Sequence, residues 1–527
     1  MKKLITSLLV VMLFLPLLGG CGKTSSGNTA EKPHIGGVYQ FPLMNEPDSL
    51  DPAFVTDGYQ SSVVVNTHIG LTTYDEKLKL QPALATSWSI SKDNKLWTFH
   101  LRKGVKFQDG STLDAGDVKY SLQRLLAPKT QSPRKNLLFD VVGAQQFAAG
   151  KSADVAGITI ADPYTVQIRL VQPHSTFLAV LSMPNCSIIP NGSAEKIGAK
   201  GYLPGAGPFE IKKWTKGKDI MLQRFDGWYG KKPYLDGIDF IIEHNYEALL
   251  ADFEKGGLDE APLVPSADEK TRWQKQGITF INEPIFGIDY IGMNINKPPL
   301  NNKKVRQAIN YAIDWSGYEG DGVVKANGII PKGMPGYKSD VAGYAYQPEL
   351  AQKLLAEAGY PKGLPQPLEL WVADDGSGGQ LAAYVATQLA QVGIQVKPAM
   401  MQWNDLMQAT HHDDLQMFQI GWTADYPEPD SMLYPLFYSK NSADEGNSTH
   451  YANKAVDSLL DKARMNNDPQ KRMQLYVQAE KIIVDDAPVI FMYHYSTSRT
   501  MQPWAHGRVI NGMGEMPVPM TAVWIFE

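Results

Sequence analysis

An α/β fold is the class that this sequence predicts, on three observations. Apolar and polar residues alternate from Val166 to Leu170 and from Ile238 to Ile242, which predicts strands with one buried face. Four other segments place apolar residues at helical spacing. Strand and helix patterns follow one another without a repeat, and helices packed on sheets give α/β or α+β architectures.

The predicted helices cover residues 305–312, 350–358, 381–392 and 468–483. The second has Pro348 placed for its first turn and Gly359 for its C-terminal cap, and Gly393 closes the third. The fourth has the clearest start. Asp468 is suited to capping free backbone amides, and Pro469 fits the first helical turn.

The first 32 residues predict export. Lys2 and Lys3 precede an apolar run from Leu4 to Leu18, which is shorter than the about 20 residues of a membrane span and is typical of a secretory signal at 1–20. Leu18-Gly19-Gly20-Cys21 resembles the bacterial lipobox. The resemblance implies cleavage before Cys21 and a diacylglycerol on its sulfur, with 21–32 as a flexible tether. The alternative is an ordinary signal with an incidental cysteine.

Composition describes a globular chain with a large core. The 527 residues are 43% hydrophobic, carry a net charge of −5, and suggest roughly two to four domains. No later apolar run reaches membrane length, and no basic stripe suggests nucleic acid. There are two cysteines, so a lipidated Cys21 would leave Cys186 without a disulfide partner; it lies in an apolar stretch and is expected to be a buried, inert thiol.

No catalytic motif stands out. The sequence has no Gly-x-Ser-x-Gly, His-Glu-x-x-His or Gly-x-x-x-x-Gly-Lys-Ser/Thr. His411 and His412 are adjacent, so on a helix they point about 100° apart, which favours a solvated helix end over a metal site. Asp374 and Asp375 precede a helix, where an N-terminal capping role and a ligand contact are equally plausible. We therefore predict no enzyme, no metal and no cofactor.

Several ordered blocks resemble the family 5 extracellular solute-binding proteins, the oligopeptide, dipeptide and nickel group that serves bacterial ABC importers. The match runs from about Gly36 to the C-terminus. The blocks are residues 48–52, 70–75, 81–88, 97–107, 109–118, 204–209, 305–309, 354–360 and 421–426.

The resemblance implies a two-lobed periplasmic-binding-protein-like fold, type II, cluster C, with an extra domain inserted in lobe one. Transferred to this chain, lobe one comprises 33–80, 201–286 and 488–527, the inserted domain 81–200, and lobe two 287–487. The extended stretches from Pro284 to Asn294 and from Ala487 to Tyr495 suit the two crossings. Ligand is expected between lobes that close around it by a hinge.

The resemblance also implies the ligand-binding residues. Asp425 matches the family's aspartate that receives the ligand's α-ammonium, and without a ligand cation its carboxylate is expected to stay hydrated. The alternative is a turn residue bonded to its own backbone before Tyr426. Trp422 would supply an adjacent wall. The other expected ligand-binding residues are Gly421, Thr423, Tyr426, the loop Thr56, Asp57, Gly58 and Tyr59, and Tyr493 and Tyr495 on the returning crossing.

The sequence departs from the family at the ligand's other end. The positions of two arginines of oligopeptide-binding relatives carry Thr410 and Gln419, and a basic residue is also absent from 376–380. The expected function is therefore capture of an extracellular oligopeptide by a lipid-anchored, monomeric receptor that delivers it to an ABC permease. The alternatives are a metal-chelate or oligosaccharide ligand, a surface hydrolase, and a signalling or chaperone-like receptor without import.

Overall fold

The computed structural model describes residues 32–197, 201–318, 323–374, 378–410, 412, 414–441, 446–514 and 518–526. The predicted signal peptide, Cys21 and nearly all of the tether lie outside these residues, as do Asp375, His411 and the side chain of Tyr495. Among the described residues, no helix combines the length and the apolar character needed to cross a membrane.

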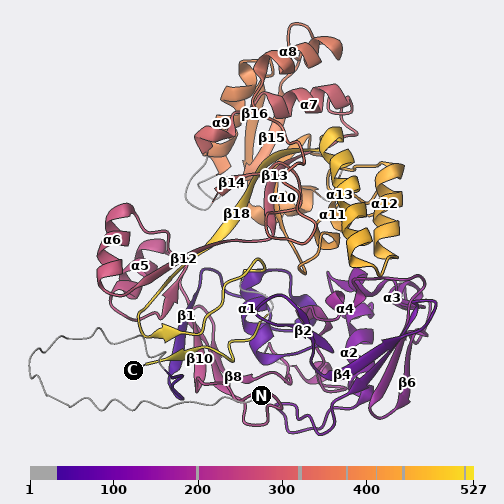
Figure 1. Ribbon diagram of the computed structural model, residues 1–527, viewed down its shortest axis with the longest axis vertical. Coiled ribbons are helices and arrows are strands. Elements are labelled where there is room, and N and C mark those ends of the chain that lie inside the picture. Colours follow the sequence, from indigo (N-terminus) through magenta and orange to yellow (C-terminus); the bar gives the residue numbers. More distant parts are fainter. Residues whose placement is uncertain are drawn as a thin grey trace, which may run out of the picture.

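The molecule has two lobes, one above the other in Figure 1. We call the lower lobe the part with the sheets β1-β10-β9-β8 and β4-β5-β7-β6, and the upper lobe the part with β15, β16, β17 and helices α7 to α13. The mixed α/β class predicted from the sequence is confirmed. The residue boundaries given above for the lobes and the inserted domain stay predictions.

The first sheet of the lower lobe joins segments that are far apart in sequence. The strand at residues 38–43 pairs in parallel with the strand at residues 237–242, with Phe41 opposite Phe240, and the other pairings are antiparallel. In spatial order the strands are β1 (Val38–Leu43), β10 (Gly237–Ile242), β9 (Asp219–Arg224) and β8 (Phe209–Thr215). Helix α1 (Gly58–Thr67) is mostly buried beside them, and α5 (Tyr246–Glu254) and α6 (Ala267–Lys275) form a small satellite core.

A second sheet of the lower lobe is fully antiparallel. It consists of β4 (Ala85–Ile90), β5 (Leu96–Leu101), β7 (Thr165–Arg169) and β6 (Ile158–Asp162). Its buried face shares one core with the helices α2 (Ala115–Leu126), α3 (Ala144–Ala148) and α4 (Phe177–Val180). The short pair β2 (Thr72–Tyr74) and β3 (Leu80–Pro82) precedes this sheet.

A third sheet runs through both lobes because of one long strand, β18 (Val489–Met501). In the upper lobe β18 pairs with β13 (Gly287–Met293), and toward the lower lobe it pairs with β12 (Thr279–Pro284). The segments predicted as crossings are therefore adjacent antiparallel strands. The other strands of the sheet are β17 (Met417–Thr423), β15 (Leu368–Ala373), β16 (Val396–Met401), β14 (Val323–Lys325) and β11 (Glu260–Ala261).

Helices cover the sheet of the upper lobe. They are α7 (Lys303–Tyr311), α8 (Pro348–Glu357), α9 (Gly378–Ala390), α10 (Trp403–Thr410), α11 (Asp430–Phe437), α12 (Lys454–Arg464) and α13 (Pro469–Asp486). All four predicted helices are confirmed. Gly359 and Gly393 follow their helices with positive φ values of 94° and 85°, and Asp468 accepts the backbone amides of Gln470 and Lys471.

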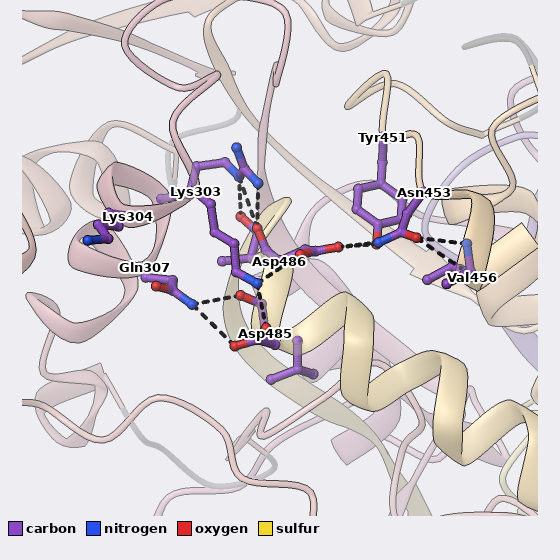
Figure 2. Close-up of polar contacts among 12 residues, drawn as sticks. Lys303, Lys304, Gln307, Tyr451, Asn453, Val456, Asp485 and Asp486 are labelled. Atoms are coloured by element: carbon purple, nitrogen blue, oxygen red, sulfur yellow. Dashed lines mark hydrogen bonds and ion pairs between the residues drawn. The ribbon is translucent and has the colours of Figure 1, made fainter. Parts of the chain in front are cut away.

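The C-terminal end of α13 is fixed to α7 just before the chain enters β18. Figure 2 shows Lys303 and Gln307 of α7 pointing at Asp485 and Asp486, while Tyr451 and Asn453 approach Asp486 from the other side. The Lys303 ammonium lies 3.0 Å from Asp486, and the Tyr451 hydroxyl donates to the same carboxylate at 2.7 Å. The contacts set the direction in which β18 leaves the upper lobe.

Cys186 is buried and free, as the sequence predicts. Burial raises the pKa of its thiol to about 12, so the thiol is protonated at neutral pH. The prediction of an inert core residue is confirmed.

Candidate ligand-binding site

A cavity of about 620 Å³ lies between the two lobes. The lower lobe contributes Thr56 to Tyr59, the upper lobe contributes the end of β17, and the crossing strand contributes Thr497 and Arg499. The complete lining is Pro42, Met44, Val55, Thr56, Asp57, Gly58, Tyr59, Arg134, Met183, Pro184, Asn185, Pro262, Ile285, Gly421, Trp422, Thr423, Asp425, Thr497, Arg499, Met513 and Gly514. A volume of this size is typical of sites that enclose a small solute.

The lower wall is a loop locked at the start of α1. Asp57 caps the helix, since its carboxylate accepts the Gln60 backbone amide at 2.8 Å. The Gln60 side chain in turn accepts the Thr56 amide at 2.7 Å. Burial, the largest influence, raises the pKa of Asp57 despite these amide contacts. The loop residues predicted from the family resemblance therefore reach the cavity on a rigid backbone.

The upper wall is the end of β17 and the loop after it. The Trp422 indole N–H donates to the Ser431 carbonyl at 2.8 Å, which fixes the ring, and the Ala424 amide donates to Phe286 at 2.7 Å. Gly421, Trp422, Thr423 and Asp425 all line the cavity. The structure thus brings these residues of the Gly-Trp block together with the loop 56–59 across one space.

Asp425 has a partner that sequence reasoning missed. The guanidinium of Arg134, from the lower lobe, contacts Asp425 Oδ1 through Nη2. Both side chains are about one-fifth exposed, at 20% and 22%. The expectation of a carboxylate held by water alone is therefore replaced by an ion pair between the lobes. No pattern near Arg134 indicates this contact, because the two residues meet only when the lobes face each other.

A second cavity of about 300 Å³ lies beyond this ion pair. It shares Arg134, Trp422 and Asp425 with the first cavity, so the pair lies where the two meet. Tyr426 lines the second cavity and not the first, and its hydroxyl donates to Asp430 at 2.6 Å.

More polar contacts join the lobes beside this second cavity. Asp140 of the lower lobe lies 2.9 Å from His174 Nδ1 and 3.9 Å from Arg464 Nη1 of α12. The backbone amide of Ser175 donates to the Arg464 carbonyl at 2.7 Å. Burial raises the pKa of Asp140, but the contact with His174 and the charge of Arg464 outweigh it and hold that pKa below its usual value.

Two further predicted residues lie elsewhere. Tyr493 is not part of either lining, and its hydroxyl donates to Asp289 at 2.8 Å. Gln419, at one of the positions where relatives carry an arginine, donates to the same carboxylate at 2.8 Å. Tyr495 lies in β18, with its backbone opposite Val323. Neither Thr410 nor Gln419 is among the residues that line the cavity.

Metal-ligating side chains do not gather in the part of the chain that the structure describes. No group of three or more His, Cys, Asp or Glu residues there has the geometry to hold an ion. His412 and Asp414 are exposed after the end of α10.

Residues 79–444 match the sequence family described as bacterial extracellular solute-binding proteins, family 5 Middle. A dipeptide-binding protein from Escherichia coli K12 is 30% identical over 502 residues, which cover 89% of this chain and 91% of that protein. The glutathione-binding protein GsiB from Salmonella paratyphi A is 31% identical over 462 residues, 84% of this chain and 86% of its own.

Among solved structures, the periplasmic binding protein DppA from Helicobacter pylori in complex with the peptide STSA superposes with a TM-score of 0.80. It is 26% identical and the match covers 93% of this chain and 98% of that one. All three of these proteins are named for binding rather than for catalysis.

Proposed function

Because the chain belongs to the bacterial extracellular solute-binding proteins of family 5, which are not enzymes, we propose that it captures extracellular oligopeptides between its lobes and delivers them to a membrane permease of an ABC importer. The observation that carries the proposal is the cavity between the lobes, with Asp425 and Trp422 on one wall and the loop 56–59 on the other. The peptide and dipeptide ligands named for its relatives support the same ligand class.

The proposed anchor of the peptide is the Asp425 carboxylate, which receives the ligand's α-ammonium. Enclosing an ammonium between lobes removes it from water, so it needs a charged partner. A charge-assisted hydrogen bond there contributes roughly 1.5–3 kcal/mol. Trp422 lies beside the carboxylate and offers an apolar face to the first peptide residue.

We also propose that Cys21 carries the lipid anchor and that the tether to residue 32 holds a monomeric receptor at the outer face of the membrane. Support comes from the order of charged, apolar and small residues before Cys21.

Calorimetry of wild type and Asp425→Asn against trialanine and N-acetyl-trialanine tests the anchor. We expect acetylation to weaken binding to the wild type by about 10- to 150-fold, since it removes the ammonium. Asp425→Asn should lose a similar factor for the free peptide and show little discrimination between the two. Equal binding of both peptides to the wild type would show that Asp425 is not an amine anchor. Absence of any peptide binding would overturn the proposed function.

A further inference from the structure

We infer that Asp425 and Arg134 act together as one receptor for an α-amino-acid head group, an ammonium and a carboxylate on the same carbon, so that the preferred ligand is a γ-glutamyl peptide. The inference rests on the proposed function and narrows its ligand class. It starts from the ion pair that already occupies the predicted amine site.

The ion pair leaves hydrogen-bonding capacity on both partners. Asp425 Oδ1 accepts a hydrogen bond from Arg134 Nη2, and no donor among the described residues bonds to Asp425 Oδ2. In the described part of the chain the Arg134 guanidinium makes no other hydrogen bond; its Nε is buried without an acceptor, so the donors open to a ligand are those of its two Nη atoms. An arginine has five N–H donors in a planar fork. Both side chains line the cavity, so an unused acceptor and unused donors lie side by side within reach of a ligand.

The backbone that carries Arg134 belongs to the rigid part of the lower lobe. The Arg134 amide donates to the Ser132 hydroxyl at 3.1 Å, and that hydroxyl donates to the Ala53 carbonyl at 2.6 Å. Ala53 lies near the loop 56–59, which forms the opposite wall of the cavity. The backbone at Arg134 is thus anchored to the lower lobe beside the cavity.

Charge balance decides which ligand suits this arrangement. Asp425 and Arg134 cancel each other, so a bare ammonium added beside Asp425 leaves one net positive charge in a partly buried place. Burying a charge without compensation is costly. A head group that carries a carboxylate on the same carbon adds no net charge. Its ammonium pairs with Asp425 while its carboxylate takes the remaining Arg134 donors in the bidentate geometry that guanidinium favours.

The chemistry of peptides then selects the linkage. In an α-linked peptide the carboxyl of the first residue is consumed in the amide bond, so its α-carbon bears only the ammonium. A γ-glutamyl residue is joined through its side chain and keeps both charged groups on the α-carbon. Thr410 and Gln419 do not line the cavity. The described lining holds two arginines: Arg499 pairs with Glu260 at 3.5 Å, and Arg134 is the one that contacts Asp425.

The test compares two isomers of one composition, γ-Glu-Ala-Gly and α-Glu-Ala-Gly, by calorimetry with the full-length protein. They carry the same charges and differ in whether a carboxylate adjoins the ammonium. We expect the wild type to bind the γ-isomer at least about tenfold more tightly. Arg134→Gln, which keeps a hydrogen-bonding side chain, should abolish this preference. Arg169→Gln is the matched control, because Arg169 is half-exposed on β7 and far from the lining.

The outcomes separate this inference from the proposed function. Equal or tighter binding of the α-isomer by the wild type would overturn the head-group inference while leaving peptide capture intact. So would a γ-preference that survives in Arg134→Gln. If trialanine and both isomers all fail to bind the wild type, the proposed function fails and the inference falls with it.

Discussion

At the scale of single residues, two buried carboxyl groups of the upper lobe have pKa values that are shifted in opposite directions. Asp430 is fully buried, and burial alone would raise its pKa, but Arg464 at 3.0 Å, His174 and hydroxyl donors lower it to about 2. Glu480 of α13 forms no ion pair with the described residues, and the charge of Lys481 lowers its pKa less than burial raises it. Its Oε1 accepts the Ile330 amide at 2.7 Å, its Oε2 has no partner, and burial raises its pKa to about 7. Partners, not depth, decide the charge of each group.

Glu480 makes stability depend on pH. In the unfolded chain the Glu480 carboxyl ionises near its ordinary pKa of 4.5, whereas in the folded protein it keeps its proton up to about pH 7. The folded state therefore holds more protons between these values, and the free energy of unfolding falls as pH rises through that window. The full pKa shift of Glu480 corresponds to a change of at most about 3 kcal/mol in the free energy of unfolding across this window. Glu480→Gln cannot ionise, so relative to wild type it should gain stability at pH 8 compared with pH 4.

Urea unfolding of wild type and Glu480→Gln at both pH values measures this difference. Glu349→Gln, an exposed carboxyl on α8, is the control and should track the wild type at both. A difference between Glu480→Gln and wild type that does not change with pH would show that Glu480 is ionised in the folded protein.

The sequence could predict a residue's role where its neighbours in the chain indicate that role, and not where the role depends on a contact with a distant segment. Asp425 lies in a block whose resemblance to the family names its role, and Asp57 precedes a helix that it caps. Arg134 belongs to no such block, and its partner is in the other lobe. A contact of this kind depends on the folded arrangement of both lobes, so no spacing along the chain could have indicated it.

At the scale of elements, helix beginnings were easier to predict than the contacts that hold helix ends. Asp468 and Pro469 mark the start of α13 by their own chemistry. Its last carbonyls are instead bound by a buried arginine of α7. Arg306 Nε and Nη2 donate to the Asp486 carbonyl at 3.0 and 2.7 Å, and Nη1 donates to Leu300 at 2.8 Å. The sequence places Arg306 on an amphipathic helix, where a charged side chain would ordinarily face water.

Arg306→Lys should therefore destabilise the protein although it keeps the charge. A lysine has a single terminal nitrogen and cannot reach both the end of α13 and Leu300, so buried carbonyls lose their donors. We expect a loss of about 2–3 kcal/mol in the free energy of unfolding, measured by urea titration.

The neighbouring Lys304→Met is the control for this substitution. Lys304 is half-exposed and pairs with Glu357 at 2.9 Å, a surface ion pair that contributes less than about 1 kcal/mol. If Arg306→Lys lowers the free energy of unfolding no more than Lys304→Met does, the hydrogen bonds of the Arg306 guanidinium do not stabilise the protein more than a surface ion pair does.

At the scale of the whole molecule, the crossing strands allow the two lobes to move relative to each other, whereas the contacts between the lobes hold them together. The strands β12, β13 and β18 connect the lobes through a narrow set of backbone pairings, an arrangement that allows hinge motion. On the far side of the cavity, α12 meets the lower lobe near α4, where Arg464 faces Asp140 and Ser175. Arg134 and Asp425 add a second bridge. Besides these charged contacts, the Thr176 hydroxyl donates to Asp430 at 3.2 Å, and Tyr426 of the upper lobe packs in the core of the lower lobe.

Removing one charge from this interface should shift the ligand-free protein toward an open arrangement. Asp140→Asn leaves the side-chain shape nearly unchanged but removes the anion that faces Arg464 at 3.9 Å and His174 at 2.9 Å. Small-angle X-ray scattering should show a larger radius of gyration for this variant than for the wild type, and a saturating ligand should restore the wild-type value, since ligand binding favours the closed state.

Asp154→Asn controls for a general loss of charge in the lower lobe. Asp154 is 57% exposed and pairs with Lys119 within the same lobe, so its substitution should leave the radius of gyration unchanged. Acidification offers an independent check with the same sign. Burial raises the pKa of Asp140, while His174 of the same lobe and then Arg464 of the other lobe lower it, so the part that Arg464 contributes to closure is lost as pH falls through the lowered value. A wild-type scattering curve that matches Asp140→Asn at neutral pH would mean that this carboxylate does not hold the lobes together.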